Sequence, residues 1–90
     1  MSDPSLRIVR KRILHRSRYR GCLEGDLLLG GFAAAYLHRL DAARLAEFEA
    51  LLEEADEDIL AWYSGRRPLP ARHDTPLFAL LQSFRPRAWR

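Results

Sequence analysis

The sequence of 90 residues has one cysteine, one glutamine and no asparagine, and it has no long uninterrupted apolar segment. One cysteine cannot form a disulfide within the chain and excludes a zinc site made of several cysteines, so we expect a reducing compartment. The most apolar stretch, residues 27–37, is interrupted by Gly30 and Gly31 and is shorter than the roughly 18 residues that a membrane-spanning helix needs. We therefore expect no disulfide and no membrane insertion.

Signals for β-structure are also missing. No segment alternates between apolar and polar residues for long enough to predict a strand, and the chain has neither internal repeats nor low-complexity stretches. Hydrophobic residues make up 48% and charged residues 30% of the sequence, which is typical of a globular domain. A chain of this length forms one domain rather than two. We predict a single helical domain over residues 1–90, with a core of about residues 5–84 and a flexible tail at residues 85–90.

Apolar residues recur at helical spacing and predict an all-α fold, a compact bundle of about five short helices. The first predicted helix covers about residues 4–19, is amphipathic and basic, and is ended by Gly21. The second covers about residues 22–40, and its glycines indicate close packing of a neighbouring helix or close approach by a partner. Its predicted apolar stripe consists of Leu23, Leu27, Leu28, Phe32, Tyr36 and Leu37.

The other three predicted helices have clear local start and stop signals. Asp41 is a good N-cap for the third helix, and Asp56 or Asp58 can cap a short fourth helix that ends at Gly65.

Thr75 followed by Pro76 is an N-cap with proline at the first helical position, which predicts the start of the fifth helix. Pro86 is expected to stop this helix. Its predicted buried face consists of Leu77, Leu80, Leu81 and Phe84.

Charge is strongly segregated along the chain. Residues 1–20 carry a net charge of +6, residues 41–58 carry −7 and residues 59–90 carry +5. This pattern permits nucleic-acid binding, binding of an acidic protein, or mutual neutralisation within the fold. A basic, acid-poor start is also compatible with a transit peptide, although its removal would leave a thin core.

The basic first helix could lie along phosphates, so a small nucleic-acid-binding module is an alternative hypothesis. The segment of net charge −7 argues against it, as does the near absence of base-reading Asn and Gln. From these residues alone, a protein partner is favoured over nucleic acid.

No group of residues points to catalysis or to metal binding. The three histidines, His15, His38 and His73, are scattered and fit surface or capping positions better than a metal site. Cys22 has no histidine base in the sequence around it, so we expect a small, partly buried residue at a helix start, where the helix could lower its thiol pKa. There is no glycine-rich phosphate loop and no recognisable set of nucleophile, base and orienting group. We expect a protein that is not an enzyme, with no catalytic residues and no metal.

The most unusual local feature is residues 18–26, which read Arg-Tyr-Arg-Gly-Cys-Leu-Glu-Gly-Asp. Within a helix, Arg20 and Glu24 would be i, i+4 neighbours in the less favourable order for an ion pair. They therefore form either an ordinary surface pair beside a helix cap or two charges that face outward for a partner.

This stretch resembles the succinate dehydrogenase flavinylation factors, the SdhE family of bacteria and its mitochondrial counterpart. The family hallmark R-G-x-x-E is matched by Arg20, Gly21 and Glu24, and the resemblance extends over roughly residues 8–84. Further matching positions are Arg16-Ser17, Asp26, Leu29, Phe32, Leu45-x-x-Phe48-x-x-Leu51-Leu52, Asp56-x-Asp58 and Trp62-x-x-Gly65.

The resemblance implies an assembly factor for another protein. Members bind the flavoprotein subunit of succinate dehydrogenase, and in some bacteria that of fumarate reductase, and promote covalent attachment of FAD to a histidine of that subunit. The attachment is held to be self-catalysed by the flavoprotein, so FAD is the cofactor of the client and none is expected to bind this chain stably. The free protein is expected to be a monomer and, with no targeting signal recognised, to reside in the bacterial cytoplasm.

The resemblance also implies where the partner binds. Arg20 would pair with an acidic group, Gly21 would permit close approach of backbone, and Glu24 would bind or orient groups near the flavin site. Three more residues are predicted at the rim of this surface: Arg16, Arg18 and Asp26.

Overall fold

Residues 4–87, the part of the chain that the computed structural model describes, contain five α-helices and two short 3₁₀ turns joined by loops. The helices are α1 (Pro4–Arg18), α2 (Leu23–Tyr36), α3 (Ala42–Leu52), α4 (Asp56–Ser64) and α5 (Pro76–Ser83), and the 3₁₀ turns are η1 (Leu37–Arg39) and η2 (Ala71–His73). The prediction of an all-α bundle of about five helices is confirmed. The last residues of the predicted tail, 88–90, lie outside the described residues.

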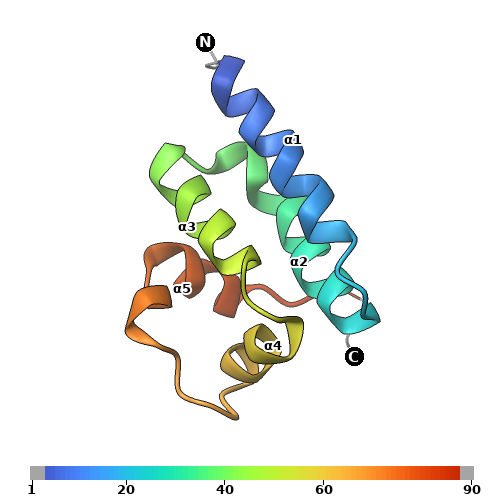
Figure 1. Ribbon diagram of the computed structural model, residues 1–90, viewed down its shortest axis with the longest axis vertical. Helices are drawn as coiled ribbons and strands as arrows, with labels where there is room; N and C mark the ends of the chain where they lie inside the picture. Colours follow the sequence, from blue (N-terminus) through green and yellow to red (C-terminus); the bar gives the residue numbers. More distant parts are fainter. Residues whose placement is uncertain (1–3, 88–90) are drawn as a thin grey trace.

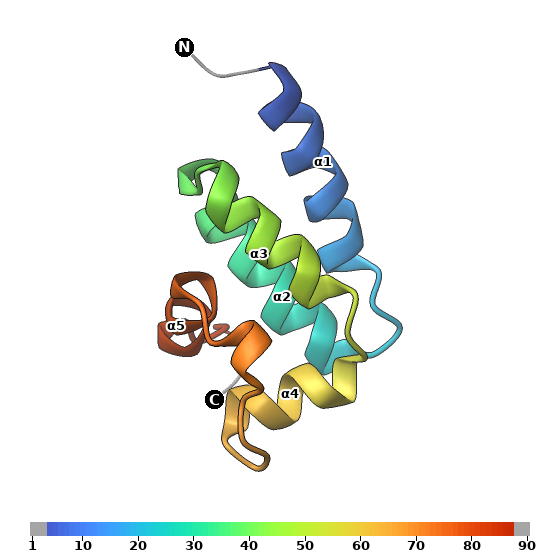
Figure 2. The same ribbon diagram turned by 60° about the vertical axis from the view of Figure 1, so that its left-hand side comes forward.

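The first two helices form an antiparallel hairpin (Figure 1). At one end of the hairpin the guanidinium of Arg10 donates to the carbonyl oxygens of Leu37, at 3.2 Å, and Leu40, at 3.0 Å. At the other end the side chain of Arg18 lies against Gly30. α3 packs on α1, α5 packs on α3, and α4 lies at the end of the bundle where α2 begins (Figure 2). The resulting globule measures 40 × 28 × 20 Å.

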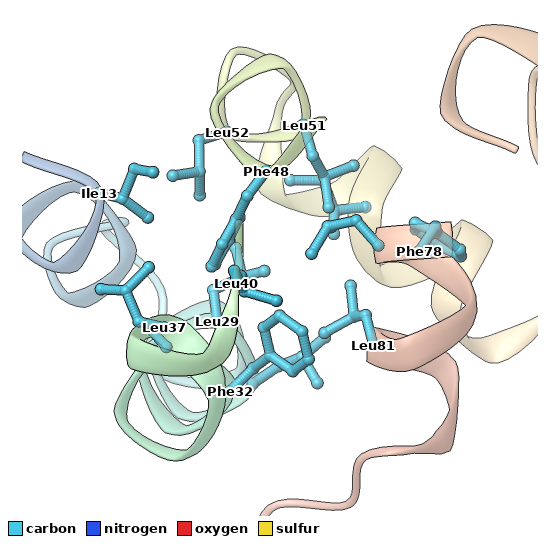
Figure 3. Close-up of a cluster of buried hydrophobic side chains, with 14 of the residues drawn as sticks. Ile13, Leu29, Phe32, Leu37, Leu40, Phe48, Leu51, Leu52, Phe78 and Leu81 are labelled. Atoms are coloured by element: carbon cyan, nitrogen blue, oxygen red, sulfur yellow. The ribbon is translucent and has the colours of Figure 1, made fainter. Parts of the chain in front are cut away.

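The hydrophobic core lies between the five helices (Figure 3). Phe32 is fully buried near its centre, with its ring centroid 5.4 Å from that of Phe48 and 5.8 Å from that of Phe84. Burial of one such side chain stabilises a fold by about 1.5–3 kcal/mol. Other fully or nearly fully buried members are Ile13, Leu28, Leu29, Leu45, Leu51, Ile59, Leu77, Phe78 and Leu81.

Three helix-end predictions based on local chemistry are confirmed. Asp41 caps α3 by accepting a hydrogen bond from the backbone N–H of Arg44 at 2.9 Å. Thr75 caps α5 in the same way, with Pro76 at the first helical position. Gly65 ends α4 in the left-handed conformation, with φ of +80°. These ends depend on the residue and its immediate neighbours, which is why sequence alone predicts them.

The second helix differs from its prediction. It begins at Leu23, and it ends at Tyr36 before tightening into η1. Leu23 was expected in the core, but its side chain is 72% exposed. It is the first residue of α2 and faces an open pocket between the starts of α2 and α4.

The start of α4 and the end of α5 also differ from expectation. Neither predicted aspartate caps α4; the N-cap is Ala55, because the carboxylates of Asp56 and Asp58 are held by Arg20 and Arg67 instead. α5 ends before Phe84, which has extended backbone and reaches the core from outside the helix.

Candidate functional site

The turn between α1 and α2, residues 19–22, carries the centre of the motif. Its backbone reverses at Gly21, where φ is +91°. A Cβ atom at Gly21 would meet no atom within 4 Å, so the glycine is required by the backbone conformation and not by packing. The carboxylate of Asp26 accepts a hydrogen bond from the N–H of Arg20 at 2.7 Å and holds the turn against the first turn of α2.

The side chain of Arg20 points into the molecule. Its Nε donates to Asp56 Oδ1 at 2.6 Å, and its terminal nitrogens donate to the carbonyl oxygens of Leu52, at 2.9 Å, and Glu54, at 2.8 Å. The two charged side chains are only 11% and 15% exposed. Arg20 therefore fastens the α1–α2 turn to the link between α3 and α4.

This arrangement corrects both interpretations of the motif's charges. Arg20 pairs neither with Glu24 nor outward, because its acid is Asp56 of the same chain. Glu24 is exposed in the first turn of α2 and forms no ion pair within residues 4–87. Contact of Arg20 with a partner stays a prediction.

Cys22 is the N-cap of α2 and lies against α4. Its sulfur accepts a hydrogen bond from the N–H of Gly25 at 3.3 Å and is 3.5 Å from Asp56 Oδ2. A Cβ atom at Gly25 would stand 3.1 Å from Asp56 Cγ, so this glycine lets the starts of the two helices pack closely. The prediction of a partly buried residue at a helix start is confirmed.

The chemistry of the thiol differs from expectation. The Gly25 N–H acts to lower the pKa of Cys22, but burial and the carboxylates of Asp56 and Asp26 outweigh it, so the pKa is raised above its ordinary value. A raised pKa keeps the sulfur protonated at neutral pH, which is the opposite of an activated nucleophile.

An open pocket of about 480 Å³, here called the acidic pocket, lies beside the turn. Its lining comes from the starts of α2 and α4: Cys22, Leu23, Glu24, Asp56, Glu57 and Leu60. Leu23 and Leu60 offer apolar surface, and Glu24 and Glu57 are exposed carboxylates at the rim. This combination suits a partner side chain that is apolar along its stem and cationic at its end.

The structure separates the six residues predicted to bind a partner. Glu24 lines the acidic pocket, whereas Asp26 holds the turn beside it. Arg16 is directed to the end of α3, where it donates to Glu53, the C-cap of this helix, at 2.6 Å. Arg18 is exposed on the other side of α1 and borders a different depression.

The sequence analysis missed the pocket residues Leu23, Glu57 and Leu60. Leu23 lies inside the motif, so its position was a usable signal that the apolar-stripe interpretation overrode. Glu57 and Leu60 carry no local signal, because they join the site only through the packing of α4 on the start of α2.

One of the three histidines, His73, lies inside the fold. His73 is buried, contrary to the expectation of a surface or capping residue, and its Nε2 lies 2.6 Å from Glu54 Oε2. Arg72 donates to the same oxygen at 2.9 Å. The hydrogen bond from Arg72, followed by that from His73, holds the pKa of Glu54 below its ordinary value.

Within residues 4–87, no group of three His, Cys, Asp or Glu side chains could hold a metal ion, and no helix has the length and apolarity to cross a membrane.

Comparison with known proteins gives a consistent result. The family model described as flavinator of succinate dehydrogenase matches residues 11–85. A protein of Schizosaccharomyces japonicus is 47% identical over 69 residues, covering 77% of this chain and 48% of its own. One of Dictyostelium discoideum is 38% identical over 74 residues, covering 82% and 52%. One of Saccharomyces cerevisiae is 43% identical over 79 residues, covering 83% and 49%.

These three relatives are all named succinate dehydrogenase assembly factor 2, mitochondrial. The chain spans about half the length of the curated relatives it matches. The prediction of a bacterial cytoplasmic protein is wrong on this comparison, since the relatives are mitochondrial proteins of eukaryotes. A missing targeting signal was a poor guide to the compartment, because it is an absence in a sequence that matches only part of its relatives.

Proposed function

Since the chain belongs to the family of flavinators of succinate dehydrogenase, as its resemblance to the flavinylation factors predicted, we propose that it is an assembly factor for that enzyme. In this proposal it binds the flavoprotein subunit and promotes covalent attachment of FAD to a histidine of that subunit. FAD is the cofactor of the client, and the bond-forming chemistry is the client's own. Burial and the neighbouring carboxylates raise the pKa of Cys22, so this thiol is not set up as an activated nucleophile.

The proposed contribution to the reaction is conformational. Attachment requires the flavin methyl carbon to lie against the target imidazole, and holding two groups in reactive geometry removes much of an entropic barrier. A rigid helical protein that binds the aligned state of the client more tightly than other states shifts the client toward alignment. Three hydrogen bonds from the Arg20 side chain, here called the Arg20 clamp, fasten the α1–α2 turn to the region where α3 ends and α4 begins. This clamp keeps the surface around the turn rigid.

The observation that carries this proposal is the acidic pocket beside the motif. Leu23 and Glu24 follow the Gly21 turn closely in the chain and are exposed where they line the pocket. Covering Leu23 with a partner would gain about 1.5–2 kcal/mol of apolar burial. We propose that Leu23 and Glu24 contact the client, with Glu57 and Leu60 of α4 on the other side of the pocket.

A flavinylation assay with matched variants tests the proposal. The apo flavoprotein subunit is mixed with FAD and a dicarboxylate, with and without this protein, and covalent flavin is read by its fluorescence on a denaturing gel. We expect the wild type to accelerate attachment and Glu24→Ala to lower that acceleration by about tenfold through loss of a contact with the client. Asp74→Ala is the matched control, because Asp74 is an exposed carboxylate away from the pocket.

The apolar half of the pocket has its own matched pair. Leu23→Ala should weaken binding of the client, whereas Ile8→Ala, which truncates another exposed apolar side chain, should not. All four variants should melt within a few degrees of the wild type, since truncations at exposed positions change stability by about 0.5 kcal/mol or less.

The outcomes separate the role from the site. Equal acceleration by wild type and Glu24→Ala would keep the assembly role and remove Glu24 from the site. A large fall in melting temperature would assign Glu24 a structural role. No acceleration and no association by the wild type would overturn the proposed function, and a nucleic-acid titration at two salt concentrations would then test the alternative.

A further inference from the structure

Helix α1 carries basic residues along two edges, and the edge facing α3 is neutralised within the fold. Arg12 Nε donates to Glu49 Oε2 at 2.7 Å, and Arg16 donates to Glu53 at 2.6 Å. The two arginines and the two glutamates are each four residues apart, so the pairs form one above the other along parallel helix faces. The acidic helix α3 thus already packs against this edge of α1 within the fold.

The opposite edge of α1 has no such partner. Arg7, Lys11 and Arg18 are spaced by four and seven residues, which places them on one side of the helix. All three are exposed, and none forms an ion pair with any residue in the range 4–87. The neighbouring helix α2 presents Ala33 and Ala34 here, and alanine supplies no counter-charge.

A depression of about 390 Å³, here called the α1–α2 groove, runs along this edge. Arg7, Lys11, Arg18 and His38 form its basic rim. Its floor is apolar, and the part open to a partner comes from half-buried Leu14 of α1 and exposed Ala34 of α2, since Ala33 and Leu37 below them are buried in the core. The guanidinium of Arg10 also borders the groove, but it is satisfied by backbone carbonyl oxygens.

We propose that the α1–α2 groove binds an acidic amphipathic segment of the client flavoprotein subunit, with an apolar side chain on the floor and carboxylates on Arg7, Lys11 and Arg18. The inference rests on the proposed function and adds a second contact surface to it. The rim supplies charge complementarity to carboxylates, and the Arg12–Glu49 and Arg16–Glu53 pairs show the same chemistry at work on the other edge.

The location and shape of the groove favour this occupant. Arg18 is the last residue of α1, so the groove extends to the end of the helix that precedes the turn at Gly21. The apolar floor lies between two helices, where a flat bilayer surface does not reach it. A phosphate backbone would meet the rim but has no apolar group to cover Leu14 and Ala34.

A pair of double variants tests the charges. Arg7→Gln/Lys11→Gln removes two rim charges, and Arg66→Gln/Arg85→Gln removes two exposed charges from the loops after α4 and α5, neither of which forms an ion pair within residues 4–87. Binding to the purified apo flavoprotein subunit is measured by surface plasmon resonance at low and at physiological salt. We expect the rim variant to bind about tenfold more weakly at low salt, with the difference shrinking as salt rises, and the loop variant to bind as the wild type does.

A photo-crosslinking amino acid in place of exposed Ala34 identifies the occupant of the groove. Mass spectrometry should find it joined to a client segment that contains several Asp or Glu residues. A neutral or basic crosslinked segment, or no crosslink in a complex that forms, overturns the inference. Displacement of the client by phosphatidylglycerol vesicles or by a DNA duplex, if lost in the rim variant, assigns the groove to that ligand and also overturns it.

The failure of this inference is distinct from failure of the proposed function. If the rim variant binds and supports flavinylation as the wild type does, the groove is wrong and the assembly role stands. If the wild type neither binds the flavoprotein nor accelerates flavinylation, both fall together.

Discussion

Along α1, the edge facing α3 and the edge bordering α2 carry the same kind of side chain, but their charges have different fates. Arg12 and Arg16 meet glutamates of α3, whereas Arg7 and Lys11 border a helix that supplies alanines. The net charge of +6 over residues 1–20 hides this difference, because it counts all basic residues together. One side of a basic helix can therefore be neutralised within the fold while the other side keeps exposed charges that a partner could bind.

The sequence left mutual neutralisation and partner binding as alternatives. Three of the basic residues near the start of the chain, Arg12, Arg16 and Arg20, are neutralised by the acidic segment of residues 41–58. The basic residues on the α2 edge are not, and they carry the proposal for a second contact surface. The two alternatives therefore apply to different residues of one segment.

The sharpest contrast is between two arginines near the same turn, and it gives the largest expected effect. Arg20→Gln should lower the free energy of unfolding by about 3 kcal/mol, because it leaves the carboxylate of Asp56 partly buried without its cation. Arg18→Gln, the same substitution two residues earlier, should change it by about 0.5 kcal/mol or less, because Arg18 is exposed. Urea unfolding of both variants provides the measurement, and equal midpoints would show that the clamp does not support the fold.

The ion pairs on the edge of α1 that faces α3 predict that stability depends on pH. The hydrogen bond from Arg12, aided by its charge and that of Arg16, holds the pKa of Glu49 below its ordinary value of 4.5. Because the folded-state pKa is lowered, this contribution to stability is present above pH 4.5 and is lost as pH falls through the folded pKa.

Glu49→Gln should therefore flatten the acid limb of a plot of melting temperature against pH, and Arg12→Gln should flatten the same limb. If the limb kept its slope in both variants, the Arg12–Glu49 pair would not contribute to acid sensitivity. The effect should be smaller than that of Arg20→Gln, because Arg12 is half exposed and such pairs are weakened by solvent.

The smallest effect on stability is expected for the edge of α1 that borders α2. Arg7 and Lys11 are like charges at i, i+4, which destabilise a helix by roughly 0.2–0.5 kcal/mol. The double variant Arg7→Gln/Lys11→Gln should then melt at the same temperature as the wild type or slightly higher. Circular dichroism is the measurement, with Arg12→Gln/Arg16→Gln as the comparison. A clear loss of stability in the Arg7/Lys11 variant would mean that this edge supports the fold and is not held for a partner.

Predictions from neighbouring residues succeeded where no distant residue competes for the same group, and they failed where one does. Asp41 and Thr75 cap their helices as expected, since a cap is formed by a side chain and a backbone N–H three residues away. The prediction that Asp56 or Asp58 caps α4 was wrong, because arginines from elsewhere in the chain hold both carboxylates. Leu23 satisfied the helical spacing of a core residue and is nevertheless exposed.

The candidate site divides in the same way. The motif predicted the turn at Gly21, which lies beside the acidic pocket, and the carboxylate of Glu24, which lines it. It could not supply Glu57 and Leu60, which are more than thirty positions away along the chain and meet the motif only when α4 packs against α2.

The sequence by itself determined the helical class, most helix ends, the glycine turn and the family. These follow from backbone geometry, apolar periodicity and a motif, all of which act over a few residues. Only the tertiary structure decided which cations are neutralised, that Arg20 serves as an internal clamp, and which helices close the pocket. Ion pairs and pockets join residues distant in the chain, and their partners are set by how the helices pack and not by local sequence.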